Sequence, residues 1–196
     1  MNKGVIQATR ILSVFGNSTE NRVQALVDSG VLADILESDP TKVDRNELRK
    51  FLGLTPTELE VLIDYTQTLE QMITAGHYDW ANSDITAKRF PLKGEGKVAR
   101  KAYLVHFDHG ISSENAIKEL DKQGKRPATI EELLAFGAKY PEIQRKFPVV
   151  ALGSSAKVDG DRSVAYLDRY GSARRLHLVW WDGDWNANYR FLAFAK

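Results

Sequence analysis

Hydrophobic residues in the second half of the chain recur with two periods, one typical of strands and one typical of helices. Residues 98–107 (VARKAYLVHF) predict a strand with an apolar second half. Two helices are predicted next, one capped near Ser112 and one capped by Thr129 with Glu132 at the capping-box position. Four strands are then predicted, in the segments FPVVALGSS, SVAYLDRY, RRLHLVWW and YRFLAFA. Because these strands are consecutive, hairpins join them most simply, and the order indicates an α+β fold with a mainly antiparallel sheet.

About the first 80 residues show helical spacing with no strand signal. Residues 3–15 predict one helix, and the cap cluster at 17–19 begins a second helix that ends near Gly30. A helix capped by Asp44 holds Leu48, Phe51 and Leu52, and Thr55-Pro56 begin another that continues to Gly76. We therefore expect a helical N-terminal region over residues 1–86 and a mixed domain over residues 87–196.

The C-terminal segment from Arg175 to Lys196 combines two strand patterns with a polar turn. Leu176 and Leu178 fall on one face of the first strand, and His177 and Val179 fall on the other. The pattern breaks at residues 182–184 (DGD), and the nearly continuous apolar run RFLAFA predicts a central strand. The segment holds three of the four tryptophans in the chain. We predict a hairpin whose outward side chains contact a partner, since aromatic and amide groups contribute much of the energy of interfaces.

Composition excludes several classes of function. Lys and Arg number 27 against 26 Asp and Glu, so charges of both signs are mixed and we expect no nucleic-acid partner. The absence of cysteine excludes disulfides, thiolate metal ligands and cysteine nucleophiles. No apolar run resembles a signal peptide or approaches the roughly 18 residues of a membrane span. We expect a soluble protein without membrane insertion, in the cytosol, the envelope or a virion.

Residues capable of metal binding or catalysis occur without the spacing that either function needs. His106 and His109 flank Asp108, but the end of a strand presents them poorly as a chelate, so we expect no metal. Ser154-Ser155 lacks a nucleophile-elbow pattern, and KGEGK at 93–97 is not followed by the Lys-Ser/Thr of a phosphate loop. We expect neither an enzyme nor a cofactor.

About the last hundred residues resemble a C-type-lectin-like domain, in particular the variable proteins of diversity-generating retroelements. The resemblance rests on the segments ATIEELL at 128–134, VALGS at 150–154 and WNANYRFLAF at 185–194. It implies a fold in which the first and last strands of the domain lie side by side. Calcium-dependent sugar binding is not expected, because Trp185-Asn186 is followed by Ala187 and the Glu-Pro-Asn or Gln-Pro-Asp partner tripeptide is missing. The resemblance does not extend to residues 1–86.

The resemblance also implies diversification. In such proteins a reverse transcriptase copies a template repeat, alters it at adenines and writes it into the end of the gene. Tryptophan cannot arise from an asparagine codon in this way, so Trp181 and Trp185 would be fixed scaffold residues that border the ligand. The variable, ligand-binding positions would be His177, Val179, Asp182, Asp184, Asn186, Asn188 and Tyr189, with Asp168, Tyr170 and Ser172 upstream. The implied function is the display of an exposed surface that binds a macromolecular ligand, which we expect to be a protein.

Other interpretations of the same residues remain open. Asp182 and Asp184 are common turn formers, and tryptophans commonly pack in a core or at its rim. The chain could be a structural or assembly subunit of a virus or host whose Trp-rich segment packs against another chain. A hydrolase with a site that the sequence does not reveal is a third possibility. The helical region could serve attachment or oligomerisation.

Overall fold

The computed structural model describes residues 20–37, 39, 48 and 59–196. The chain divides into two units, residues 1–51 and residues 52–196. In the first unit, α2 (Glu20–Asp28) and α3 (Val31–Glu37) are joined through Gly30, whose φ of 74° suits glycine. Helix α2 occupies the segment in which we predicted a helix after the cap cluster at 17–19. The helices predicted at 3–15 and around Leu48 fall largely outside the described residues.

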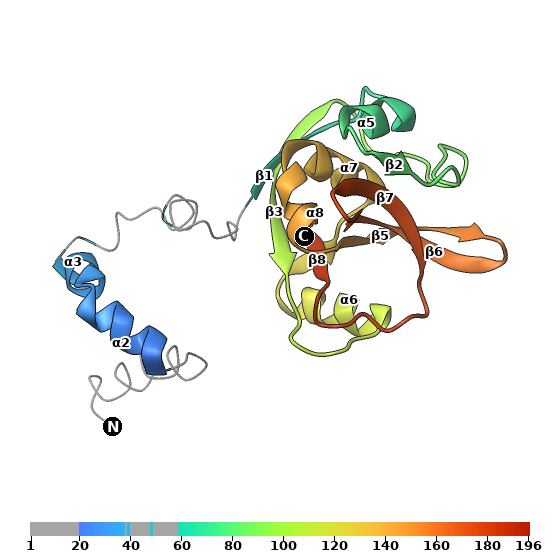
Figure 1. The fold of residues 1–196 in the computed structure, drawn as a ribbon. Coiled ribbons are helices and arrows are strands. Elements are labelled where there is room, and N and C mark those ends of the chain that lie inside the picture. The colour runs from blue at the N-terminus through green and yellow to red at the C-terminus, as the bar shows by residue number, and fades with distance from the viewer. Residues whose placement is uncertain (1–19, 38, 40–47, 49–58) are drawn as a thin grey trace. The chain divides into compact units, whose positions relative to one another are not determined.

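The second unit contains an eight-stranded sheet (Figure 1). Its strand order is β1-β3-β8-β5-β6-β7-β2, and the short strand β4 also pairs with β8. Neighbouring strands are antiparallel except for the parallel pairs β5–β8 and β2–β7. The strands are β1 (Leu59–Asp64), β2 (Trp80–Ala81), β3 (Lys97–Val105), β4 (Lys125–Pro127), β5 (Val149–Val158), β6 (Asp161–Tyr170), β7 (Ala173–Trp180) and β8 (Arg190–Ala195).

The helices of this unit cover both faces of the sheet. They are α5 (Leu69–Ala75), α6 (Ser113–Lys122), α7 (Ile130–Lys139) and α8 (Pro141–Lys146). Helix α7 begins as predicted, because Thr129 is its N-cap and the Glu132 carboxylate accepts the Thr129 backbone N–H at 2.9 Å. The predicted strand, two helices and four strands occur in that order as β3, α6, α7 and β5 to β8, but the short strand β4 and helix α8 were not predicted. The mixed α+β class is confirmed.

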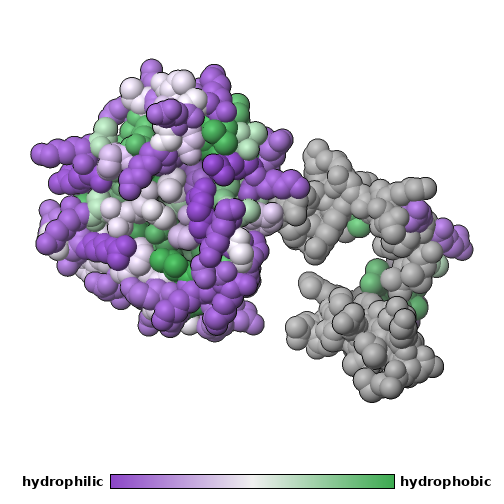
Figure 2. Space-filling view, turned by 180° about the vertical axis from the view of Figure 1, so that it is seen from behind, coloured by the Kyte–Doolittle hydropathy of each residue, from purple (hydrophilic) through white to green (hydrophobic). Residues whose placement is uncertain are grey.

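Two hydrophobic cores lie on opposite faces, because alternate residues of each strand point to opposite sides. Ala165 and Leu167 of β6 join the first core with residues of α5, α7 and α8. Val164 of β6 joins the second core with Ala116 of α6 and with Trp181 and Trp185. The face drawn in Figure 2 is mainly hydrophilic, with small separate hydrophobic patches. Among the described residues, no helix has the length and apolarity to cross a membrane.

The expectation that the first 80 residues contain no strand is wrong. Strand β1 occupies the first half of the helix predicted from Thr55 to Gly76, and β2 follows at Trp80–Ala81. Leu59, Val61 and Ile63 are buried while Leu62 is 54% exposed, which is the alternation of an edge strand. Only the second half is helical, as α5. Residue 86, where we placed the end of the N-terminal region, lies inside the unit that begins at Leu52.

The predicted hairpin between the last two strands is also wrong. Strand β7 pairs with β6 and β2, whereas β8 pairs with β3, β5 and β4. Residues 181–189 therefore cross the sheet from β7 to β8, past the positions of β6 and β5. Strand β8 is apolar and central, as expected. Its neighbours on the two sides are β3 and β5, so β7, which precedes it in sequence, is not its partner.

Candidate functional site

Beyond α6 and residues 181–189, the second face of the sheet carries polar and aromatic side chains of β6 and β7. Tyr166, Asp168 and Tyr170 alternate with first-core residues along β6. Tyr166 lies opposite His177 of β7, and Asp168 lies opposite Arg175. The antiparallel register therefore builds this surface from cross-strand pairs, whose side chains contact one another directly.

Asp168 and Arg175 form a two-point ion pair. Nη2 of Arg175 lies 2.5 Å from Oδ2 of Asp168, and Nε lies 3.0 Å from Oδ1. The Asp168 carboxylate raises the pKa of Arg175. Burial, with a contribution from the Asp168 charge, raises the pKa of Tyr166 to about 12. The Tyr166 hydroxyl, which donates to Oδ2 of Asp168 at 3.4 Å, is therefore neutral at physiological pH.

The crossing segment 181–189 forms the boundary of this surface, and its tryptophans fix it in place. Nε1 of Trp185 donates to Oγ of Ser113 at 2.9 Å, and that hydroxyl donates to the Trp181 carbonyl at 2.7 Å. Nε1 of Trp181 donates to the Glu114 carboxylate. Trp181 and Trp185 are 4% and 2% exposed. These two residues, predicted to border the ligand, have rings that pack in the second core and are closed to a ligand.

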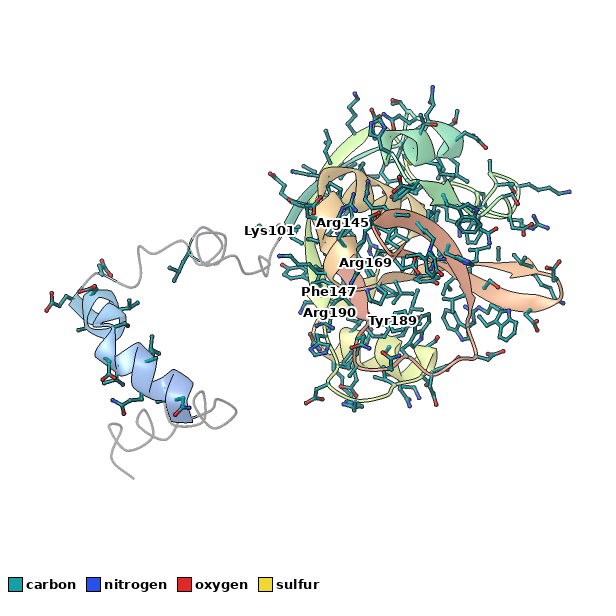
Figure 3. All side chains as sticks on the ribbon, in the orientation of Figure 1. Lys101, Arg145, Phe147, Arg169, Tyr189 and Arg190 are labelled. Carbon is teal, nitrogen blue, oxygen red and sulfur yellow. The ribbon has the colours of Figure 1, made fainter. Side chains whose placement is uncertain are left out.

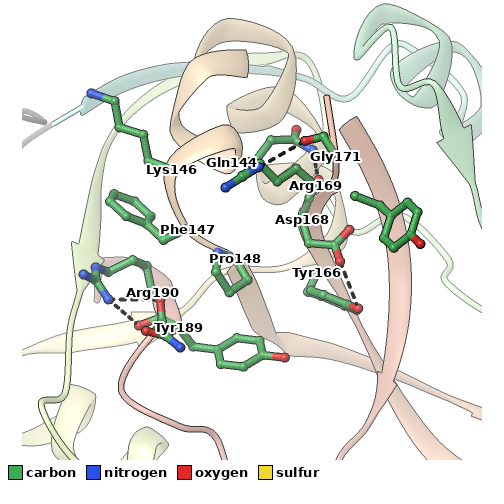
Figure 4. Close-up of a pocket in the computed structure, with 12 residues that line it drawn as sticks. Gln144, Lys146, Phe147, Pro148, Tyr166, Asp168, Arg169, Gly171, Tyr189 and Arg190 are labelled. Carbon is green, nitrogen blue, oxygen red and sulfur yellow. Dashed lines mark hydrogen bonds between the residues drawn. The ribbon is translucent and has the colours of Figure 1, made fainter. Parts of the chain in front are cut away.

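A groove of about 550 Å³ lies between β6 and the end of the crossing segment (Figure 4). Tyr166, Asp168 and Arg169 line one side of it. Phe147 and Arg190 lie on the other side, where Figure 4 also shows Tyr189 directed toward Tyr166. Tyr170, Asn188 and Lys146, all exposed, also line the groove.

Arg190 is held by the end of the crossing segment and by Phe147. Its Nη1 donates to the carbonyls of Ala187, Asn188 and Tyr189 at 3.3, 3.1 and 3.0 Å. Its guanidinium carbon lies 4.5 Å from the ring centre of Phe147, which is cation–π range. Desolvation lowers the pKa of Arg190, but an arginine remains charged in proteins. Figure 3 shows Arg145, Arg169 and Arg190 on the same side of the molecule, around Phe147.

An aromatic row extends from the groove across the sheet. The ring centres of Trp80 and His177 are 4.8 Å apart, and those of His177 and Tyr166 are 5.7 Å apart. Tyr166 and Tyr189 follow at 6.3 Å, and Tyr189 and Trp185 at 4.9 Å. Trp80 is 44% exposed. The row joins the buried Trp185 to the exposed Trp80, and each ring restricts the position of the next.

The structure divides the predicted ligand-binding residues into groups. Five lie on the surface just described: Asp168, Tyr170, His177, Asn188 and Tyr189. Val179 lies on the same face of β7 but packs against the second core. Ser172 is exposed on the β6–β7 turn, and its carbonyl accepts from Arg145. Asp182, Asp184 and Asn186 are exposed on the crossing segment. Asp184 lines a different hollow, with Phe107, His109 and Asn115.

Sequence patterns alone did not identify Tyr166, Phe147, Arg190 or Trp80. Tyr166 could have been predicted from the sequence, because the alternation of β6 places it on the same face as Asp168. Trp80 and Phe147 come from segments far from the crossing segment in sequence. Their proximity results from the parallel pairs β2–β7 and β5–β8, for which the sequence gives no local signal.

The histidines considered as metal ligands make other contacts. Nε2 of His106 lies 2.8 Å from the Ala187 carbonyl, and Nδ1 of His109 lies 3.0 Å from the Asp108 carboxylate. Within the described part of the chain, no three His, Asp or Glu side chains are grouped as a metal site would require.

Comparison with protein-family models, with curated proteins and with solved structures finds no match for this chain.

Proposed function

We propose that this chain is a ligand-binding protein without catalytic activity, and that its contact surface is the open part of the second sheet face together with the groove beside Arg190. The observation that carries the proposal is the placement of Asp168, Tyr170, His177 and Asn188. These polar and aromatic groups lie on one surface, while their neighbours in sequence, such as Leu167 and Leu176, are buried. A surface of this kind tolerates substitution without loss of the core.

The chemistry of the surface suits a protein ligand. Tyrosines, Asn188 and arginines supply large contact area and adaptable hydrogen bonds, which are the groups enriched in protein-binding paratopes. The two-point pair of Asp168 with Arg175 and the carbonyl contacts of Arg190 hold these groups in position. Because little ordering entropy is then lost on binding, more of the contact energy contributes to affinity.

The proposal extends to the finer fold and to diversification. Residues 87–196 would form a C-type-lectin-like domain, and the exposed positions would vary as in the retroelement proteins that the sequence resembles. Antiparallel pairing of β3 with β8 supports this, since these are the first and last long strands of that range. Burial of Trp181 and Trp185 supports their role as invariant scaffold. Strands β1 and β2 lie outside that range and would be additions to the domain.

Two experiments test the proposal. The gene should be followed by a nearly identical repeat that differs only at adenines, beside a reverse transcriptase gene. Independently, a random peptide display library should be panned against the full chain, and the binders mapped by amide chemical shifts. Binders that perturb Asn188 and Tyr170 support the proposal, whereas binders that never contact this surface contradict it.

A matched pair of variants separates binding from folding. Asn188→Ala should leave the free energy of unfolding within about 0.5 kcal/mol of the parent, since the residue is exposed, and should weaken the selected binders. Leu176→Ala removes a fully buried side chain and should cost about 2–5 kcal/mol. Equal destabilisation by the two variants in denaturant titrations would contradict the division between surface and core.

The alternative is an assembly subunit, and the exposed tryptophan of β7 favours it. Trp180 is 68% exposed and Tyr170 is 75% exposed, which is typical of residues that another chain covers. Light scattering over a concentration series tests this alternative. Self-association that Trp180→Ser abolishes would support it, and a monomer at all concentrations would leave ligand binding as the better explanation.

A further inference from the structure

The guanidinium of Arg190 has hydrogen-bond donors that the protein does not use. Only Nη1 donates to carbonyls, those of residues 187–189. Within the described part of the chain, Nε and Nη2 of Arg190 have no hydrogen-bond partner, and neither is among the fully buried unsatisfied atoms. A guanidinium fixed through one nitrogen presents its other N–H groups in a rigid plane that matches a carboxylate.

The groove around Arg190 has an excess of positive charge. Lys146 and Arg169 line it as well, and neither forms an ion pair with another described residue. The only carboxylate among the lining residues is that of Asp168, which Arg175 already neutralises. The whole chain has a net charge of only +1, so this excess is local. A local cluster of unpaired cations favours an anionic group in the ligand.

We propose that the groove binds an acidic side chain of a protein ligand, with Nε and Nη2 of Arg190 as the principal donors to the carboxylate. This inference rests on the proposed function and specifies its ligand. The rings of Tyr166 and Tyr189 line the same groove, so an aromatic or aliphatic residue next to the acid would also be buried. The exposed amide of Asn188 offers hydrogen bonds to the ligand backbone.

A protein segment fits the groove better than single-stranded nucleic acid does. Strong nucleic-acid binding needs a track of cations along many phosphates and rings free for stacking. In this groove the cations are Lys146, Arg169 and Arg190, which surround one hollow and do not form a linear track, and Arg190 already contacts the Phe147 ring.

The test uses the full chain and three probes in low-salt buffer, with amide chemical shifts as the readout. The probes are the peptide acetyl-Gly-Asp-Tyr-Asp-Gly-amide, its uncharged counterpart with Asn in place of each Asp, and a short oligothymidylate. The acidic peptide should give saturable shifts at Asn188 and Arg190 and should bind at least about tenfold more tightly than the Asn peptide, a difference of about 1.4 kcal/mol.

Substitutions of exposed cations test the charge of the groove without disturbing the fold. Arg190 also fixes residues 187–189, so Arg190→Gln alone could act through the backbone. Lys146→Gln and Arg169→Gln remove exposed charges of the groove, and each should lower the affinity for the acidic peptide about two- to five-fold. Lys157→Gln removes an exposed charge from β5 outside the groove and should leave the affinity unchanged.

Three outcomes would overturn the inference. The first is equal affinity for the acidic and the Asn peptide, and the second is equal weakening by Lys157→Gln and Lys146→Gln. The third is tighter binding of oligothymidylate at the same residues, which would assign the groove to nucleic acid. Library binders that contact Asn188 but carry no acidic residue would disprove the inference and leave the proposed function intact. Absence of binders at this surface would instead disprove the proposed function.

Discussion

Single buried polar residues connect the candidate surface to the first core. Arg174 is 5% exposed, and it neighbours Arg175 in β7 but points to the opposite face. Its Nη1 donates to the Gly76 carbonyl at 2.8 Å, and Nη2 donates to the Gly137 carbonyl at 2.8 Å and to Oε1 of Gln144 at 3.0 Å. The same Gln144 donates to the Asp168 carbonyl at 2.7 Å. One buried arginine thus joins α5, α7, α8 and β7.

Replacing Arg174 should destabilise the fold strongly. Arg174→Met leaves two carbonyls and the Gln144 amide without their donor, and the loss of several charged hydrogen bonds should cost about 3 kcal/mol. Urea denaturation provides the measurement. Arg169→Met, at an exposed position of β6, is the control and should change stability by less than about 0.5 kcal/mol. Similar midpoints for the two variants would argue against the network.

Glu131 in the first turn of α7 gives a pH-dependent prediction. It is 2% exposed, and burial is the main cause that raises its pKa above the ordinary value. The folded state therefore favours the protonated form, so this group stabilises the fold below its unfolded pKa and loses that contribution as the pH rises through its folded pKa. Glu131→Gln imitates the protonated form and should stabilise the protein at pH 7.

Measuring stability over a pH series tests whether the charge of Glu131 causes the stabilisation expected for Glu131→Gln. The advantage of Glu131→Gln in thermal midpoint should shrink as the pH falls toward the ordinary pKa of glutamate, because the parent then becomes protonated as well. An advantage that is constant with pH would mean that packing is responsible. Glu142→Gln, at an exposed position of α8, is the control and should show no such trend.

At the scale of elements, β5 is held against the segment that precedes α7. Gly153 donates its N–H to the Ala128 carbonyl at 2.7 Å. The register of β5 with β6 shifts between Val150 and Ser155, so the strand is irregular where it meets this carbonyl. A Cβ on Gly153 would lie 2.5 Å from the Ala128 oxygen and 2.7 Å from the Pro127 oxygen.

Gly153→Ala should therefore destabilise the protein by about 1–3 kcal/mol, because backbone atoms of a packed sheet must move. Gly110→Ala is the matched control, since its added Cβ would meet only the Trp185 carbonyl, at 4.0 Å, and it should be nearly neutral. Thermal unfolding of both variants under the same conditions gives the comparison. Equal melting temperatures would show that β5 can relax away from Ala128.

At the scale of the whole molecule, the first core depends on residues before the predicted boundary at 86. Strand β1 and helix α5 contribute Leu59, Val61, Ile63, Leu69 and Met72 to it. Each buried side chain of this type stabilises the fold by about 1.5–3 kcal/mol. The net stability of a domain of 50 to 200 residues is about 5–15 kcal/mol, so the loss of several such side chains is enough to unfold it.

Truncation tests where the folding unit begins. The fragment 52–196 should unfold cooperatively, because it keeps β1 and α5. The fragment 87–196 should lack a cooperative transition and should bind hydrophobic dyes, since part of the first core is missing. Circular dichroism melts of the two fragments and the full chain measure this. A cooperative melt of 87–196 would instead support a domain boundary near residue 86, as inferred from the sequence.

The sequence by itself determined where strands β3 and β5 to β8 and helices α6 and α7 lie, and which faces the strand residues occupy, but not β4 or α8. Period-two alternation placed Leu176 inward and His177 outward, and cap residues located α6 and α7. These features depend on residues within a few positions of one another in sequence, so the sequence pattern is sufficient to predict them. The same reasoning failed at β1, where Leu59, Leu62 and Ile63 also fit a helical period and only pairing with β3 made the segment a strand.

Only the tertiary structure decided which strands are neighbours, and with them the candidate site. Consecutive strands β7 and β8 are separated in the sheet, and the crossing segment buries Trp181 and Trp185 over the second face. The groove forms because β5 pairs in parallel with β8 and brings Phe147 to Arg190. Such pairing depends on the competition among all strands for partners on both sides, and that competition is not encoded in any single stretch of sequence.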